Sequence, residues 1–280
     1  MKPGIYYDIP FAEYLRIDAI SNSYLKRIAQ SPAHAIVPFK STSAMREGRI
    51  LHTLILEPEK ESEVIATAPE GSRNSNAFKQ AVESQFGITY PGKWADAQEL
   101  ISAKRGIEVV DAHQLECFKQ VAKQIKETPE VYKLLKGTRR EVTVIWEREG
   151  HLCKARIDAL GEWATDIKST VDSSPVKFAR QAFPFGYHRQ DAWYMSGLEA
   201  NGVKAKGMAF IAFQKQEPFN PMIYVFSEED RDIAEAENEY LFQLAVQCKK
   251  TGNYPGYEHT GGRVRTLEKP GYYQPIGGRS

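Results

Sequence analysis

The stretch RIDALGEWATDIKST, residues Arg156–Thr170, places two carboxylates and a lysine among apolar residues that are typical of a buried hairpin. Side chains on a strand alternate between faces, so Asp166 and Lys168 share one face and Ile167 points into the core. A tight turn in the middle of the stretch brings Asp158 close to Asp166 across the two strands. The stretch therefore predicts a hairpin that gathers charged side chains where a sheet opens.

The residues around this hairpin predict the rest of a sheet. Residues 140–170 are rich in β-branched and aromatic residues, and breaks at Gly150 and Gly161 predict three strands joined by tight turns. Two helices, two strands and a long helix are expected next: about Pro175–Ala182, about Tyr187–Ala200, GMAFIAFQ (207–214), PMIYVFS (221–227) and 228–250, with Ser227 as N-cap and Gly252 beyond its end.

The N-terminal part has helical periodicity. We expect a helix in SNSYLKRIAQSP (21–32) and another over about 44–57, capped by Ser43 and ended by Pro58. Irregular chain with a short helix near Phe78 is expected next, and then a helical region over about 94–135. The chain is expected to form one domain: a mainly helical part (1–135), a catalytic α/β core (136–252) and a C-terminal tail (253–280).

Composition limits the function classes. The formal net charge is +1, whereas a protein that coats nucleic acid nonspecifically is strongly basic, so any nucleic-acid site must be local. No apolar run approaches the roughly 18 residues of a transmembrane helix, and the N-terminus lacks a signal peptide. The 3 cysteines are scattered, which favours a reducing cytosol and argues against a four-thiolate iron–sulfur or zinc site.

The carboxylates and the lysine form a candidate metal site. Mg²⁺ takes one or two protein carboxylates and keeps water and phosphate oxygens in its shell. A neighbouring lysine orients or deprotonates the attacking water and stabilises charge on phosphate. Alternatively, Asp158 and Asp166 are strand-edge residues paired with Arg156 or Lys168, and their spacing alone does not decide between the two.

Three further features favour the metal site if the fold brings them to it. His52 lies on the otherwise apolar face of the helix over 44–57, where it is either a core residue or a metal ligand. Glu141 opens the first strand, and it is otherwise an exposed strand end. Gln190 and Tyr194 lie one helical turn apart with Tyr187 on the same side. This face either contacts the DNA backbone or supports the site, or it belongs to an amphipathic helix with an aromatic stripe.

These residues and their surroundings resemble the RecE/RecB-type branch of the PD-(D/E)xK nucleases. The matching blocks occur in the order SPAHAI, AMREGRILHTLILEPE, REVTVIW, CKARID, DIKST and YHRQDAWY. The likeness is to the C-terminal nuclease domain of exodeoxyribonuclease VIII (RecE) and similar phage proteins, and it covers about Ile20 to Gly252. It implies a restriction-endonuclease-like α/β fold, with a mixed central sheet flanked by helices and a helical N-terminal part.

The resemblance also implies a role for each matching residue. His52, Asp158, Asp166 and the Ile167 carbonyl would bind Mg²⁺ or Mn²⁺, Lys168 would be the catalytic lysine, Glu141 would act near the metal or the water, and Gln190 and Tyr194 would form the Q-x-x-x-Y pair. The implied activity is 5′-to-3′ digestion of linear double-stranded DNA, which leaves 3′ single strands for a RecT-like annealing protein. A homo-oligomeric ring around DNA and a location in the bacterial host cytoplasm are implied as well.

Some positions depart from the family pattern. Ile157 stands where the superfamily name has proline, a change that this branch tolerates. The four-cysteine iron–sulfur cluster of some relatives is excluded because only 3 cysteines are present. No GxxxxGK[ST] motif occurs, so we expect a stand-alone nuclease and not a fusion to a helicase motor.

Phosphate contacts require basic residues near the site. Arg156 is the first candidate because it shares a strand face with Asp158, and Arg27, just before SPAHAI, is the second. The other candidates are Arg49, Arg46, Arg139, Arg140 and Lys154. Each of these side chains is otherwise a solvated surface charge.

Two other functions stay open at the level of sequence. One is a nuclease with the same core that acts on single-stranded or branched DNA. The other is a catalytically idle module that holds DNA or a protein partner. The clustered carboxylates argue against the idle module, since their mutual repulsion is a cost that a binding module has no need to bear.

Overall fold

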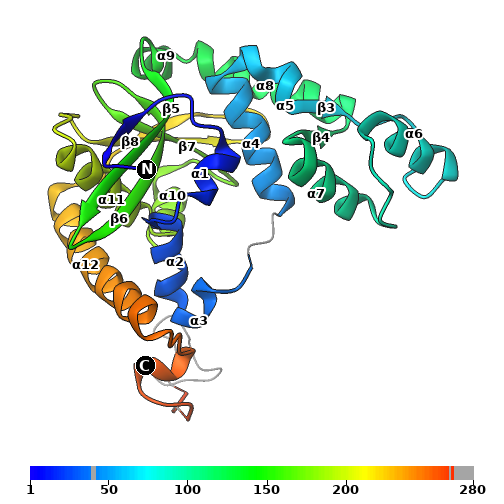
Figure 1. Cartoon of the computed structure of the whole chain (residues 1–280). Coiled ribbons are helices and arrows are strands. Elements are labelled where there is room, and N and C mark those ends of the chain that lie inside the picture. The colour runs from blue at the N-terminus through cyan, green and yellow to red at the C-terminus, as the bar shows by residue number, and fades with distance from the viewer. Residues whose placement is uncertain (39–41, 265, 268–280) are drawn as a thin grey trace, which may run out of the picture.

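The computed structural model of the chain describes residues 1–38, 42–264, 266 and 267, and it shows a central sheet flanked by helices (Figure 1). The strands of the main sheet are β1 (Gly4–Tyr6), β2 (Ile20–Ser21), β5 (Arg139–Arg148), β6 (His151–Leu160), β7 (Ala164–Thr170), β8 (Met208–Gln214) and β9 (Met222–Tyr224). A second, two-stranded sheet consists of β3 (Ile65–Thr67) and β4 (Glu108–Val110).

The helices precede, interrupt and follow the strands. They are α1 (Phe11–Arg16), α2 (Asn22–Gln30), α3 (Pro32–Ala35), α4 (Ser43–Leu56), α5 (Glu61–Val64), α6 (Asn76–Phe86), α7 (Trp94–Arg105), α8 (Ala112–Glu127), α9 (Pro129–Leu135), α10 (Pro175–Ala182), α11 (Tyr187–Ala200) and α12 (Glu228–Thr251). Two 3₁₀ turns are η1 (Pro58–Lys60) and η2 (Tyr257–Thr260).

The main sheet is mixed, with the strand order β1-β5-β6-β7-β8-β9 and β2 beside β6. The pairs β1–β5, β5–β6, β6–β7 and β8–β9 are antiparallel, whereas β7–β8 and β2–β6 are parallel. The parallel β7–β8 pair requires a crossover connection, which α10 and α11 supply. This arrangement confirms the predicted α/β fold with a mixed central sheet.

β6 and β7 separate soon after their turn. They pair only at Ala159↔Thr165 and Leu160↔Ala164, and farther along β6 the short strand β2 pairs with it instead. The two strands therefore form a fork, with Asp158 and Asp166 at the positions immediately beyond the last pair. The fork leaves backbone groups of both strands without partners in the sheet, and these groups must be satisfied by side chains.

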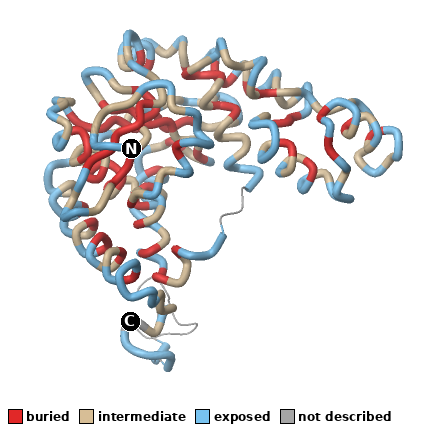
Figure 2. The backbone as a smooth tube through the Cα atoms, in the orientation of Figure 1, coloured by how far each residue is buried: buried red, intermediate tan, exposed pale blue. Residues whose placement is uncertain are grey.

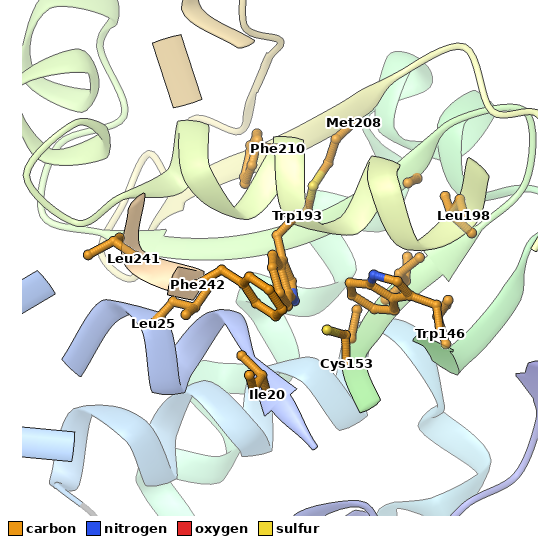
Figure 3. Packing of buried hydrophobic residues seen from close by; sticks show 14 of the residues in the cluster. Ile20, Leu25, Trp146, Cys153, Trp193, Leu198, Met208, Phe210, Leu241 and Phe242 are labelled. Carbon is orange, nitrogen blue, oxygen red and sulfur yellow. The ribbon is translucent and has the colours of Figure 1, made fainter. Parts of the chain in front are cut away.

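One face of the sheet packs against α2, α10, α11 and α12. Trp193 of α11 lies over Trp146 of β5, with ring centroids 5.0 Å apart, and Phe242 of α12 completes this contact (Figure 3). Gly197 permits the close approach of α11, because a Cβ there would lie 2.7 Å from the Trp146 ring. The position of α11 over the sheet is therefore fixed by tight packing.

The opposite face packs against α4, α8 and α9. Leu51, Leu54 and Ile55 of α4 belong to the same buried cluster as Ile167 of β7 and Ile211 of β8. Buried residues concentrate in the sheet and on the helix faces that cover it (Figure 2). Because α4 packs on β7, residues near position 50 lie beside residues near position 167.

The segment 65–110 forms a small lobe at one end of the molecule, on the right in Figure 1. Its strands β3 and β4 are parallel, and its helices α6 and α7 lie between them in the chain. Phe78 and Phe86 of α6 and Ile101 of α7 are buried in a core of its own. This lobe was not predicted, because a buried three-residue strand is too short to show a periodic pattern.

The predicted elements of the sheet region agree with the structure, and the corrections lie outside them. The long helix has the predicted caps, since Ser227 Oγ accepts from the Asp230 N–H and Gly252 has a left-handed φ of 68°. Thr42, and not Ser43, caps α4, because Thr42 Oγ1 accepts from the Met45 N–H. The helical region predicted over 94–135 is interrupted by β4.

The predicted C-terminal tail, 253–280, is described only in part: residues 265 and 268–280 lie outside the described residues. Within the part of the chain that the structure describes, no helix is both long and apolar enough to cross a bilayer.

Candidate active site

The candidate site lies at the fork between β6 and β7. Asp158 of β6 accepts the Ile167 backbone N–H with its Oδ2, at 2.8 Å. The separation of the strands deprives this N–H of a partner in β6, and the carboxylate takes that place. The Asp158 side chain is thus fixed at the point where the sheet opens.

α4 brings His52 to the same point. Its Nε2 lies 3.1 Å from the Ile167 carbonyl oxygen, and its Nδ1 lies 3.5 Å from Asp158 Oδ2. His52 was predicted to be a metal ligand only if its helix packs against the carboxylates. In the structure, α4 packs there. The Ile167 carbonyl, which was expected near the metal, points at this histidine.

Glu141 reaches the site through a distorted backbone. Its φ is 50°, a left-handed conformation that is uncommon for a residue other than glycine and costs about 1–2 kcal/mol. The β5–β6 register has pairs on both sides of Glu141 but none between Glu141 and Asp158. The carboxylate is held by Arg156, whose Nε lies 2.5 Å from Glu141 Oε2. Strain of this kind is concentrated at functional sites.

Asp166 and Lys168 of β7 form a second pair on the other side of the fork. Lys168 Nζ lies 2.5 Å from Asp166 Oδ2, and Gln190 Nε2 of α11 donates to Asp166 Oδ1 at 2.5 Å. The shared face predicted for Asp166 and Lys168 is therefore present. The Lys168 ammonium also lies over the Tyr187 ring, 4.7 Å from its centroid.

Tyr194 lies one turn after Gln190 on α11, close to the carboxylates. Burial raises the pKa of its hydroxyl well above the ordinary value, and Tyr14, Asp166 and Asp158 add to this shift. Tyr194 therefore stays neutral and can donate a hydrogen bond but carries no charge.

Burial and crowding alter the protonation of the site. Burial raises the pKa of Asp158 to about 7, with a smaller contribution from Asp166, whereas His52 opposes the shift. Burial lowers the pKa of His52, but the carboxylates around it outweigh burial and raise the value overall. The pKa of Lys168 is raised in the same way, chiefly by Asp166, against the effect of burial. Without a metal, the pKa shifts of Asp158 and His52 therefore both favour the protonated forms.

The donor atoms fit a divalent cation. One ligand atom from each of His52, Glu141 and Asp158 lies within 4.8 Å of the others. An imidazole beside two carboxylates is a donor set that suits Mn²⁺ or Mg²⁺. Asp166, a predicted ligand, lies beside this trio but is directed to Lys168 and Gln190. In the structure, Glu141 therefore takes the place among the candidate ligands that the sequence predicted for Asp166.

The predicted phosphate-binding arginines lie in different surroundings. Arg156 is mostly buried and donates to the Ile9 carbonyl as well as to Glu141. Arg49 lies 2.5 Å from the buried carboxylate of Glu108. Arg27 donates to the Val37 carbonyl. Contacts of these arginines with DNA stay predictions, and Arg156 is the one that the fold places at the site.

Sequence reasoning placed Tyr187 on the same side of the helix as Gln190 and Tyr194, and the structure brings the Tyr187 ring beside Lys168. It missed Lys26 of α2, which the structure places near the same lysine. An isolated lysine on a predicted surface helix carries no signal of a nearby site.

Comparisons with known proteins agree with this geometry. The profile of a family described as "PDDEXK-like domain of unknown function (DUF3799)" matches residues 21–264. No curated protein matches the chain. The crystal structure of a "putative exonuclease" from Eubacterium rectale matches with a TM-score of 0.56 and 15% identity over 93% of each chain, which shows a shared fold. The chain therefore belongs to the PDDEXK-like domain family of unknown function (DUF3799), with the restriction-endonuclease-like fold of the PD-(D/E)xK nuclease superfamily.

Proposed function

We propose that this protein is a divalent-metal-dependent DNA exonuclease that hydrolyses phosphodiester bonds of linear double-stranded DNA. The observation that carries the proposal is the arrangement at the fork, where His52, Glu141 and Asp158 cluster beside the Asp166–Lys168 pair. Mg²⁺ or Mn²⁺ bound to these carboxylates would supply Lewis-acid polarisation of the phosphate.

Lys168 has the properties of an electrostatic stabiliser in this reaction. Its raised pKa keeps the ammonium protonated at neutral pH, so it does not accept a proton from water. Instead, its charge opposes the negative charge that develops on the phosphate, and it can donate a proton to an oxygen. Of the roles that the sequence left open for Lys168, this assignment favours stabilisation of charge on the phosphate over deprotonation of the attacking water.

Asp166 and Gln190 position this lysine. Asp166 Oδ2 faces the ammonium, and the Gln190 amide holds the other carboxylate oxygen in place. Because α11 is packed tightly on the sheet, the orientation of Gln190 is fixed before any substrate binds. A site assembled in advance in this way loses less free energy to reorganisation in the transition state.

The finer assignments rest on the resemblance to RecE-like nucleases. They are digestion from the 5′ end, production of 3′ single strands for a RecT-like annealing protein in recombination, assembly as a homo-oligomeric ring, and action in the cytoplasm of a bacterium that carries a phage or prophage.

End-labelled duplexes test the function directly. Wild-type protein, Lys168→Ala and Asp166→Ala are incubated with linear and circular duplexes in Mg²⁺, Mn²⁺ or EDTA. We expect wild-type protein to shorten only linear DNA, only with metal, and to distinguish 5′-phosphate from 5′-hydroxyl ends. If linear duplex stays intact with both metals, the proposal is wrong. Cleavage confined to single-stranded or branched controls would identify a different substrate.

A further inference from the structure

A row of side chains leads from Lys168 out of the candidate active site to the surface. The Lys168 ammonium lies 4.7 Å from the centroid of the Tyr187 ring. The Tyr187 and Phe185 rings are 6.0 Å apart, centroid to centroid. The ammonium of Lys26 lies over the outer ring, 4.9 Å from the Phe185 centroid. Two aromatic rings therefore lie in a row between the Lys168 ammonium at the site and the Lys26 ammonium near the surface.

Lys26 forms no ion pair with a carboxylate among the described residues. Its helix, α2, contacts α11, which carries Tyr187. Burial lowers the pKa of Lys26, and the nearby charges of Lys168 and Arg189 lower it further. Lys168 and Arg189 are each paired with a carboxylate, Asp166 and Glu237, whereas Lys26 has no such pair among the described residues, so a phosphate would supply its missing counter-charge. The surroundings of Lys26 thus suit a phosphate.

Phe185 offers an exposed ring beside this cation. Its side chain is 47% exposed, and the neighbouring Phe183 is 43% exposed. Large aromatic side chains that stay in water while they adjoin a site are typical of stacking surfaces for nucleic-acid bases. Stacking of this kind is tolerant of base identity, because each base has a π-face.

We propose that Lys26 and Phe185 form a strand-binding subsite next to the reacting phosphate, where the ammonium holds a phosphate and the ring stacks on a base. This inference rests on the proposed function, since it assigns the substrate strand a path away from Lys168. The ligand class is a nucleic-acid strand with an accessible base. Tyr187 separates the subsite from the catalytic lysine and fixes the spacing between the two.

A second copy of the chain is the rival occupant of this surface. Exposed apolar side chains also suit an interface between protomers. Charge disfavours a two-fold interface of identical surfaces, because it would bring Lys26 of one copy toward cations of the other. The surface around Phe185 is also continuous with the candidate active site through Tyr187, which favours the strand. The rival predicts that substitutions here change the oligomeric state and leave strand binding intact.

Binding of a labelled oligothymidine strand to the full chain tests the subsite, with a strand of equal length lacking bases as the second probe. Fluorescence anisotropy in Ca²⁺ buffer gives the Kd, and a gel verifies that the strand stays intact. Lys26→Ala is expected to weaken binding of both probes about tenfold and to reduce the salt slope by about 0.7. Phe185→Ala is expected to weaken only the base-bearing probe, about tenfold.

Matched controls come from a similar pair on α9. Lys136 Nζ lies 5.8 Å from the centroid of the exposed Tyr132 ring, and Lys136→Ala and Tyr132→Ala are expected to bind both probes like wild type. Lys26→Arg and Phe185→Trp should keep most of the affinity, which separates lost contacts from misfolding. Sedimentation of every variant reports the oligomeric state.

Any of three outcomes overturns the inference: Lys26→Ala and Phe185→Ala bind like the Lys136→Ala and Tyr132→Ala controls, the wild-type protein does not bind the strand, or the variants change only the oligomeric state. The duplex-digestion assay is scored separately. Strand binding without cleavage leaves the subsite in place and refutes the nuclease, whereas cleavage without any effect of these variants refutes the subsite alone.

Discussion

Two buried carboxylates, Glu108 and Asp158, lie close to α4 but in opposite electrostatic surroundings. Glu108 Oε1 is 2.5 Å from Arg49 Nε, which ties α4 to the small lobe, and it accepts from Ser102 Oγ within the lobe at 2.9 Å. Asp158 has a second carboxylate, Glu141, within ligand distance. Glu108 is paired with a guanidinium, whereas Asp158 lies between the His52 imidazole and a second carboxylate.

The difference separates a structural carboxylate from a functional one. A buried ion pair with good geometry holds two elements together, and breaking it leaves a charge buried without a partner. A cluster of buried carboxylates opposes folding until a cation binds. The burial of a carboxylate therefore does not indicate its role, whereas the sign of the neighbouring charges does.

The largest expected effect is on the rate. Lys168→Ala removes the cation that we propose stabilises charge on the phosphate, and it should lower the rate of duplex digestion about 100- to 1,000-fold. Glu108→Gln, in the small lobe, should leave the rate within about twofold of wild type at temperatures where it is folded. Release of acid-soluble nucleotides from linear duplex measures both. Equal losses in the two variants would show that the candidate site matters no more to the rate than the ion pair in the lobe.

The next effect is a loss of stability in the lobe. Glu108→Gln weakens the ion pair with Arg49 and should lower the free energy of unfolding by about 2 kcal/mol. Urea denaturation in EDTA measures the change, with Glu99→Gln on the exposed side of α7 as the matched control. A loss no larger than that of the control would show that the pair contributes nothing to the attachment of the lobe.

The third effect is a gain in the stability of the metal-free protein. Burial raises the pKa of Asp158 to about 7, so the metal-free fold loses stability as pH rises from about 4 to about 7. Asp158→Asn removes the charge and should stabilise the metal-free protein by about 1 kcal/mol near pH 8, after allowance for the lost attraction to His52. The gain should vanish near pH 4, where the wild-type carboxyl is protonated. A loss at pH 8 would contradict the comparison.

The fourth effect concerns metal binding. Asp158 must lose its proton to become a ligand, so the affinity for Mn²⁺ should rise about tenfold between pH 6 and pH 8. Isothermal titration calorimetry measures the affinity and the proton release, which depends on the ionisation heat of the buffer. In Asp158→Asn both binding and proton release should be strongly reduced. Affinity that does not change with pH would place the metal elsewhere.

The sequence predicted the central part of the fold well, because local signals coincide there. The β-branched residues of 140–170 and the glycine turns mark three strands, and the caps at Ser227 and Gly252 mark the long helix. The lobe escaped prediction since its strands have three residues each. Short strands are stabilised by their partners, and nothing in the sequence near them shows which partner that is.

The sequence by itself determined which charged residues the hairpin carries and that Asp166 and Lys168 share a face, because strand alternation is a local property. Only the tertiary structure decided which of them meet. His52 and the Ile167 carbonyl are 115 residues apart in the chain, and the packing of α4 on β7 brings them together. The fork that directs Asp158 to the Ile167 N–H and the left-handed backbone that turns Glu141 to the site depend on contacts across the whole sheet.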